Sequence, residues 1–456
     1  MGNNQTKGAH RLGKESIGKL LWSLSVPGVV GMATQALYNI VDSIFVGRYS
    51  SEGLTAVSAA FPMQMIIIAI AVGTGIGATS LISRYLGQGN KQDAKLAAEH
   101  TLILCFVYGA LTALLGFFLA KPMAHFFVDD PGIASQAADY LRIIFVGSIG
   151  LYFPVCSNNI LRGQGNTFYP MLVLLLGAGL NILFDPFLIF GLGPFPTLGV
   201  KGAAYATILA KIISGLFLVY LLFQRENDII PDFRGYHFSP RILWELYQVG
   251  LPTIAFQLLG SIAVAGMNKL VGSIEPLAIA AVGVYFRLQS FIMMPIAGLN
   301  QGLTPIVGYN YGKQDQKRVK EAIWKATVAA LVMATAGLLA FQLFPRQLLQ
   351  LFNSDEALTG IGIPALRRMT LAMHFVGLFM IISATFQAVG RGLPSLVLSL
   401  LRQVIFVLPL MAYLLSHHSL EACWYAVPIA DTLAAILAIL WIAVSARKWN
   451  LSSERN

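Results

Sequence analysis

Two aspartates, Asp42 and Asp185, lie in stretches of the sequence that are otherwise almost wholly apolar. Asp42 occurs in NIVDSIFVG (39–47) and Asp185 in NILFDPFLIFG (181–191). An ionisable side chain in a segment suited to a lipid bilayer is costly, so a function is its default explanation. Two carboxyl groups held close together in a medium of low dielectric share protons, and their oxygens can also hold one Na⁺. The two residues therefore indicate a site that binds H⁺ or Na⁺.

Helical spacing brings further polar side chains to the depth of the aspartates. Asp42 and Asp185 lie five and six residues before a glycine that ends their apolar segment, and Thr207 lies eight residues after the glycine that begins the next one. At a rise of about 1.5 Å per residue, the three are level. Asn181 precedes Asp185 by four residues and shares its helix face. We predict a cation-coupling cluster of Asp42, Asn181, Asp185 and Thr207; the alternative is that each aspartate only bonds a neighbouring helix.

Other residues are candidates for the lining of a substrate cavity or for coupling to it. Gln35 and Asn39 precede Asp42 by seven and three residues, so they form a stripe on one helix face. A proline inside a helix bends it, and Pro27 lies fifteen residues before Asp42. We therefore expect ion binding at Asp42 to be coupled to a bend at Pro27. The cavity candidates are Gln35, Asn39, Phe153, Asn158 and Asn159.

Three more ionisable residues could modify such a site. Lys211 lies one turn beyond Thr207; it either pairs with Asp185 in competition with a cation, or extends along its own stem. Asp431 is the one deeply placed acid of the second half, and it serves either as a contact between helices or as part of the ion pathway. Arg287 either satisfies carbonyl groups at a helix end or lines water.

The segments that carry these residues identify the class of protein. Of 456 residues, 56% are hydrophobic and 11% charged, against roughly 25% charged in soluble domains. Such a chain cannot cover a surface that faces water, so we predict an all-α integral membrane protein embedded in a lipid bilayer. Twelve apolar segments have about the length of a spanning helix: 22–47, 54–84, 96–119, 136–161, 168–190, 199–224, 242–271, 277–308, 321–343, 363–388, 393–416 and 420–446.

The distribution of Lys and Arg sets the expected orientation. With a cytoplasmic N-terminus, the cytoplasmic segments hold 20 of the 31 Lys and Arg residues and the outer loops hold 7. Cytoplasmic loops carry such an excess. We therefore predict a multi-pass protein of the bacterial cytoplasmic membrane with both termini in the cytoplasm. The same bias explains the net charge of +10, so we expect no nucleic-acid partner.

The chain also repeats itself at a constant offset of 225 residues. This offset aligns AVSAAFPMQ (56–64) with AVGVYFRLQ (281–289) and matches three pairs of glycines: Gly73 with Gly298, Gly77 with Gly302 and Gly87 with Gly312. Six spans per repeat is an even number, so the halves share one orientation and are related by an axis along the membrane normal. We predict an N-terminal cytoplasmic segment (1–21), an N-lobe (22–224), a cytoplasmic linker (225–241), a C-lobe (242–446) and a cytoplasmic tail (447–456).

The same motifs resemble the multidrug and toxic compound extrusion (MATE) family over nearly the whole chain. The resemblance is carried by YNIVDSIFVG (38–47), YLGQGNKQDA (85–94), LRGQGNT (161–167), LNILFDP (180–186), GAAYAT (202–207) and PIVGYNYGKQD (305–315). The last is most similar to the DinF-like branch, which includes MepA-type bacterial pumps. The resemblance implies two pseudo-symmetric six-helix lobes, alternating access, and export of organic cations and amphipathic drugs in exchange for H⁺ or Na⁺.

Residue by residue, the resemblance assigns the cation site of the DinF-like N-lobe to Asp42, Asn181, Asp185 and Thr207, and the bending position to Pro27. The sequence departs from the NorM-type branch, whose C-lobe cation site uses acids on spans 7 and 10, because no acid aligns there. Lys211 has no place in the family pattern. Neither H⁺ nor Na⁺ is favoured as the coupling ion.

Rival functions are disfavoured by the residues present. A flippase for lipid-linked oligosaccharides needs cationic residues for a diphosphate head group, whereas the N-lobe candidates are acidic, amide or apolar. A membrane-embedded enzyme needs a cluster of metal ligands or a nucleophile with its base, and the seven histidines contain no HExxH arrangement. Two pseudo-symmetric lobes fit a transporter that works by rocking better than they fit a channel. We expect no catalytic residues, no cofactor, no metal beyond Na⁺ at the coupling site, and a monomer.

Overall fold

The structure is a computed structural model that describes residues 8–225, 227–352 and 356–453, with side chains as far as residue 446. The described chain is helical and contains no strand within these ranges. Residues 1–7 of the predicted N-terminal segment and residues 454–456 of the predicted tail lie outside them.

The first half of the chain forms eight helices. They are α1 (Ala9–Lys14), α2 (Ile17–Tyr49), α3 (Ser51–Gly87), α4 (Lys91–Phe127), α5 (Pro131–Val146), α6 (Ile149–Gly163), α7 (Phe168–Phe190) and α8 (Val200–Leu222). The linker that follows contains one short 3₁₀ turn, η1 (Phe233–Gly235).

The second half starts after this linker. Its elements are α9 (Pro240–Gly272), α10 (Pro276–Gly312), α11 (Gln316–Leu343), α12 (Pro345–Gln350), α13 (Glu356–Met369), α14 (Met373–Ala388), α15 (Gly392–Leu400), the π-helical turn η2 (Leu401–Phe406), α16 (Val407–His417), α17 (Leu420–Cys423) and α18 (Ala426–Ser453).

The prediction of twelve spans is confirmed when two bent helix pairs are each taken as one span. Ten stretches are long and apolar enough to cross a membrane by themselves, and the pairs α5 with α6 and α13 with α14 bend by 48° and 52°. The predicted spans 136–161 and 363–388 therefore each contain a bend. At both breaks the backbone forms tighter i→i+3 bonds: the Ser148 N–H donates to the Phe145 carbonyl and the Met373 N–H to that of Thr370.

Capping residues recur at the repeat offset and explain where paired helices begin. The Asn90 Oδ1 accepts a hydrogen bond from the Asp93 N–H at 3.1 Å, and the Asp315 Oδ1 accepts one from the Arg318 N–H at 3.1 Å. Asn and Asp are favoured at this position because their side chains satisfy a free N–H of the first helical turn. The polar motifs GQGNKQD and YGKQDQK are thus the starts of α4 and α11.

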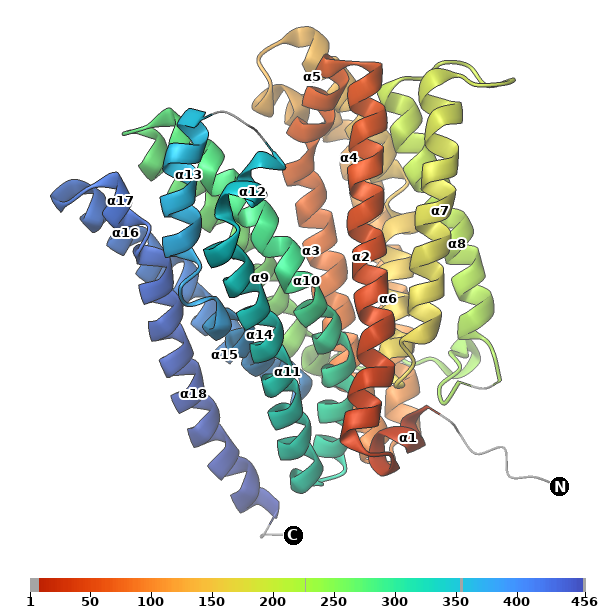
Figure 1. The fold of residues 1–456 in the computed structure, drawn as a ribbon. Helices are drawn as coiled ribbons and strands as arrows, with labels where there is room; N and C mark the ends of the chain where they lie inside the picture. The colour runs from red at the N-terminus through yellow and green to blue at the C-terminus, as the bar shows by residue number, and fades with distance from the viewer. Residues whose placement is uncertain (1–7, 226, 353–355, 454–456) are drawn as a thin grey trace.

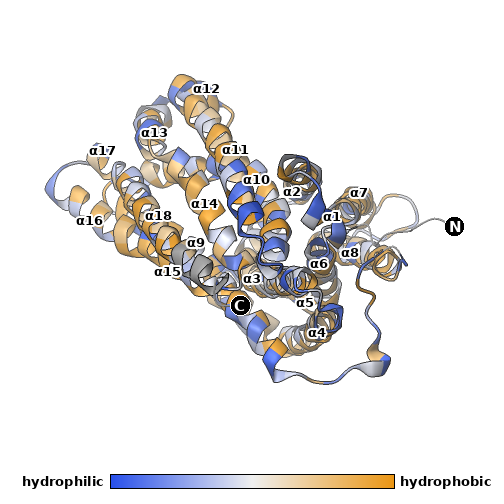
Figure 2. Ribbon diagram, turned by 90° about the horizontal axis from the view of Figure 1, so that it is seen from below, coloured by the Kyte–Doolittle hydropathy of each residue, from blue (hydrophilic) through white to orange (hydrophobic). Residues whose placement is uncertain are grey.

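Helix α1 and the end of α18 lie at one end of the helix bundle, which we call the terminal face; the opposite end is the distal face (Figure 1). The helices of the N-lobe (α2–α8) and of the C-lobe (α9–α18) diverge toward the distal face (Figure 1). Seen from the terminal face, hydrophobic residues cover most of the helix surfaces, while hydrophilic residues gather at helix ends and loops (Figure 2). This pattern is what a bilayer-embedded bundle requires.

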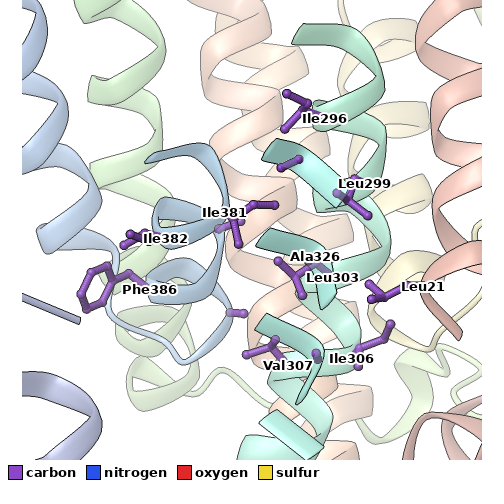
Figure 3. Close-up of a cluster of buried hydrophobic side chains, with 14 of the residues drawn as sticks. Leu21, Ile296, Leu299, Leu303, Ile306, Val307, Ala326, Ile381, Ile382 and Phe386 are labelled. Atoms are coloured by element: carbon purple, nitrogen blue, oxygen red, sulfur yellow. The ribbon is translucent and has the colours of Figure 1, made fainter. Parts of the chain in front are cut away.

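Four clusters of buried apolar side chains show how the lobes are joined. One cluster takes its buried members from residues 46–208 and a second from 267–430, so each lobe has its own core. The other two clusters combine residues of both halves. In one of these, Leu21 of α2 faces Leu303 and Ile306 of α10, with Phe386 of α14 on the far side (Figure 3). The lobes therefore share a core only toward the terminal face.

Glycines allow the lobes to touch through their backbones, and they do so reciprocally. A Cβ atom on Gly87 of α3 would collide with the Tyr309 carbonyl of α10, and one on Gly312 of α10 would collide with the Arg84 carbonyl of α3. Because Gly87 and Gly312 are related by the 225-residue offset, as are Arg84 and Tyr309, each lobe offers the other the same contact. This is the arrangement expected of a two-fold axis between repeats.

The short helix α1 adds hydrogen bonds to the contact between the lobes at the terminal face. Arg318 donates from Nη2 to the carbonyls of Leu12 (3.0 Å) and Glu15 (2.6 Å), and Asn310 donates from Nδ2 to Leu12 (3.0 Å). The Ala9 N–H donates to Asp228 Oδ2 of the linker at 2.7 Å. Helix α1 thus joins the C-lobe to the linker at the terminal face.

We expect Gly87→Ala and Gly312→Ala to destabilise the closed terminal face, because each new methyl group meets an opposing backbone carbonyl. Overpacking of this kind costs about 1–3 kcal/mol. The measurement is the unfolding temperature of the purified protein in detergent. Gly283→Ala in α10 is the matched control, since a Cβ there meets nothing within 4 Å. Equal unfolding temperatures for all three variants would contradict the assigned contact.

Candidate cation-coupling site

The structure brings together the four residues predicted to form the cation cluster. Asn181 on α7 donates from Nδ2 to Asp185 Oδ1 and to Thr207 Oγ1 on α8, at 3.3 Å each. One amide group therefore orients the carboxyl group of its own helix and ties α7 to α8. Asp185 is fully buried and Asn181 is 3% exposed, so both lie inside the lobe.

The carboxyl group of Asp42 on α2 completes the cluster. The two carboxyl groups of Asp42 and Asp185 lie within electrostatic reach of each other. Two neighbouring buried carboxylates disfavour each other's charge, so the pair favours a shared proton or a bound cation.

Oxygen atoms of the cluster lack protein partners. Asp42 Oδ1, Asn181 Oδ1 and Asp185 Oδ2 are buried and make no hydrogen bond within the described protein. Buried polar atoms are rarely left without a partner, and those that are call for an explanation such as a bound ion or water. Carboxylate and amide oxygens are the ligands that hard cations prefer. The donor set therefore fits Na⁺ as well as a proton.

Three residues that the sequence did not single out surround the carboxyl pair. Tyr140 of α5 is 4% exposed; its hydroxyl lies beside Gln64 of α3 and within electrostatic reach of Asp42, Asp185 and Tyr38. The sequence offered a signal for Gln64, because the repeat offset of 225 residues matches it to Gln289. Tyr140 offered no comparable signal, since an isolated tyrosine in an apolar helix is common.

A cavity of about 70 Å³ lies next to the cluster. Its lining includes Gln35, Asn158, Asn181, Thr207 and Lys211. Pockets for drug-sized ligands typically measure about 300–1,000 Å³, so this cavity suits an ion and a few water molecules rather than a drug. Gln35 and Asn158 border this cavity, and their contact with a substrate stays a prediction.

The other cavity candidates lie elsewhere. Asn39 is exposed on α2 and does not border this cavity. Phe153 packs against Phe106, with ring centroids 6.2 Å apart. Asn159 is 6% exposed and accepts hydrogen bonds from Thr79 Oγ1 at its carbonyl (2.8 Å) and at Oδ1 (3.2 Å). Phe153 and Asn159 therefore contact neighbouring helices in this conformation, and their role in a substrate cavity stays a prediction.

The ionisable residues have distinct surroundings. The Lys211 Nζ lies over the ring of Tyr38, 5.8 Å from its centroid, and among the described residues it forms no ion pair with Asp185. Of the two alternatives for Lys211, the ion pair with Asp185 is thus not found among the described residues; the ammonium lies against an aromatic ring instead. Arg287 is exposed on α10, and Asp431 is 4% exposed and pairs with Arg402.

Comparisons with known proteins place the chain among membrane transporters. It matches the family model MatE over residues 27–187 and 252–414, two stretches whose starts differ by the 225-residue repeat. It is 29% identical over 433 residues to a protein of Shewanella oneidensis named FAD transporter, covering 94% of this chain and 95% of that protein. It is 25% identical over 429 residues to multidrug export protein MepA of Staphylococcus saprophyticus, covering 94% of each.

Solved structures give the same result for the fold. One is described as the outward-facing conformation of a multidrug resistance MATE family transporter of the MOP superfamily. It matches with a TM-score of 0.91 and 31% identity, and the match covers 97% of this chain and 98% of that one.

We expect the combined variant Asp42→Asn/Asp185→Asn to lose the response of its unfolding temperature to cations. A ligand that binds only the folded state stabilises it by RT ln(1 + [L]/Kd). Added Na⁺, or a lower pH that supplies the shared proton, should raise the unfolding temperature of the unsubstituted protein. Glu52→Gln, at an exposed acid in the first turn of α3, is the control. A double variant that responds like the unsubstituted protein would rule out this site.

Proposed function

The chain belongs to the MatE family of membrane transporters, and on that premise we propose that it is a secondary active exporter of amphipathic organic cations, driven by entry of H⁺ or Na⁺ through Asp42 and Asp185. Family membership confirms the predicted resemblance and makes the protein a multi-pass membrane transporter rather than an enzyme. The observation that carries the proposal is the interaction of two carboxyl groups, of which Asp42 Oδ1 and Asp185 Oδ2 are buried and make no hydrogen bond within the described protein.

The proposed cycle depends on helix α2, which joins the ion site to the contact between the lobes. Its distal half carries Asp42, while Ser25 in its terminal half donates from Oγ to the Leu299 carbonyl of α10 at 3.4 Å. Val29 packs against Gly298 of α10 so closely that a Cβ there would clash. Pro27 lies between these contacts in a helix that is continuous from Ile17 to Tyr49.

Binding and loss of an ion change the forces on α2. When the pair has lost its ion, the two carboxylates repel and α2 is pushed away from α7; when a proton or Na⁺ binds, the repulsion ends and the helices approach. Because Pro27 lacks an N–H, it leaves the carbonyl four residues earlier free and lowers the resistance of α2 to bending. The displacement at Asp42 is thereby passed to the contacts with α10.

The positive-inside distribution of Lys and Arg supports a cytoplasmic terminal face and an external distal face. In that orientation the carboxyl pair lies in the outer half of the bacterial cytoplasmic membrane, where it loads ions from outside. One charge that crosses the whole membrane potential contributes roughly 2.3 kcal/mol per 100 mV, which favours ion entry over ion exit.

A relative named FAD transporter supports a second candidate cargo, a flavin dinucleotide. A dinucleotide is anionic at its pyrophosphate, so it differs from an organic cation in the charge that a binding surface must meet. The two cargoes are separated by direct transport assays with each compound.

The deciding experiment is ethidium transport in proteoliposomes, with pH and Na⁺ gradients imposed separately. We expect one gradient alone to drive transport, and Asp42→Asn or Asp185→Asn to reduce it to the rate of protein-free liposomes, because neither retains the ionisable pair. Glu52→Gln should transport normally. A flavin dinucleotide is assayed in parallel. Unchanged ethidium transport by both aspartate variants would refute the coupling role.

Replacement of Pro27 should separate ion binding from transport. Pro27→Ala restores a backbone hydrogen bond and stiffens α2, so we expect slower ethidium transport while the unfolding temperature still responds to cations. Pro122→Ala, at an exposed proline inside α4, is the control. Normal transport by Pro27→Ala would show that a bend of α2 at this residue is not needed.

A further inference from the structure

A second buried ionic group lies in the C-lobe, far along the chain from the carboxyl pair. Arg402 in the π-helical turn η2 donates from Nη1 to Asp431 Oδ1 of α18 at 3.1 Å. Asp431 is 4% exposed and the Arg402 side chain 18% exposed. Breaking such a pair is expensive, because one charge is then left in a medium of low dielectric.

The surroundings of this pair contain few other groups that could neutralise it. The Arg402 guanidinium lies over the ring of Phe379 on α14, 5.0 Å from its centroid. Tyr285 of α10 is buried within electrostatic reach of both charges, and its hydroxyl accepts a hydrogen bond from Gln289 Nε2 at 2.9 Å. Among the described residues, Arg402 is the charged group that acts on Asp431. Its guanidinium supplies the whole counter-charge.

The pair falls close to the positions that correspond to the ion site of the N-lobe. The 225-residue offset places Asp431 on Ala206, which is next to Thr207, and Arg402 on Gly177, one turn from Asn181. In the N-lobe, α7 and α8 are tied there by the hydrogen bond from Asn181 to Thr207. In the C-lobe, η2 and α18 are tied there by the ion pair.

The two lobes differ in how a buried carboxyl group is neutralised. The N-lobe holds two carboxyl groups and keeps its nearby cation, Lys211, over Tyr38 rather than on Asp185. The C-lobe holds one carboxyl group with a cation fixed to the chain. The π turn at residues 401–406 adds a residue to that helical turn and changes which side chains face α18. Such turns are frequent at functional sites.

We propose that Asp431 and the adjacent Tyr285 form a second cation site, which the chain itself fills with the guanidinium of Arg402, so that ion coupling is confined to the N-lobe. The inference rests on the proposed function only in taking the N-lobe pair as the coupling site. Removal of Arg402 leaves Asp431 buried without a counter-charge, and a proton or Na⁺ then takes the place of the guanidinium.

The test is a gain of cation binding in a protein whose N-lobe site has been removed. Asp42→Asn/Asp185→Asn should show no change of unfolding temperature with Na⁺ or between pH 8 and pH 6. Addition of Arg402→Gln should restore a response to one of them, with about one cation bound per protein by calorimetry. Addition of Arg402→Lys, which keeps the positive charge, should not. Addition of both Arg402→Gln and Asp431→Asn should abolish the restored response.

Each outcome decides the inference. It is overturned if the variant with Arg402→Gln unfolds cooperatively but binds no cation, or if the N-lobe double variant alone still responds. If Arg402→Gln does not accumulate as folded protein, the N-lobe double variant decides. A change of its unfolding temperature with Na⁺ or pH overturns the inference, and no change supports it. If the unsubstituted protein shows no response while the variant with Arg402→Gln gains one, this inference stands and the proposed function fails.

Discussion

The backbone contact between the lobes near the terminal face is the constraint on which the rest of the structure depends. Gly87 and Gly312 let the backbones of α3 and α10 approach so closely that a single methyl group at either position would prevent the contact. Without a hydrophobic force between helices in lipid, close packing of this kind is what holds them together. Since the contact is made twice, once from each repeat, it fixes the symmetry axis and leaves the distal halves with separate cores.

Charges inside the bilayer are the second constraint, and the two lobes meet it in opposite ways. The Arg402–Asp431 pair is neutral by itself, so it adds stability to one arrangement of η2 and α18. The Asp42–Asp185 pair is neutral only with an ion from outside the chain, so its stability depends on conditions. A site of the second kind can do work in a transport cycle, because its energy changes when an ion arrives or leaves.

The sequence could predict the span number, the repeat and the four residues of the ion site, because each depends on period, offset or depth along one helix. It could not predict the bends at Gly147–Ser148 and Thr370–Ala372, where the apolar pattern continues across the break. Nor could it predict which faces of two helices meet. Gln35 and Asn39 share a stripe in the sequence, yet only Gln35 borders the cavity, and the partner of Asp431 is 29 residues away on another helix.

The position of α2 follows from both constraints together. It is the N-lobe helix that carries one member of the carboxyl pair and also packs against α10 of the other lobe, through Ser25 and Val29. In the proposed cycle, a change of charge at Asp42 therefore acts on the contact between the lobes through a single helix, with Pro27 between its two contacts with α10. In that proposed cycle, the C-lobe has no matching ion to gain or lose while Arg402 stays on Asp431. The C-lobe would then be the fixed surface against which α2 moves, so that two repeats of similar shape give a cycle driven by the N-lobe.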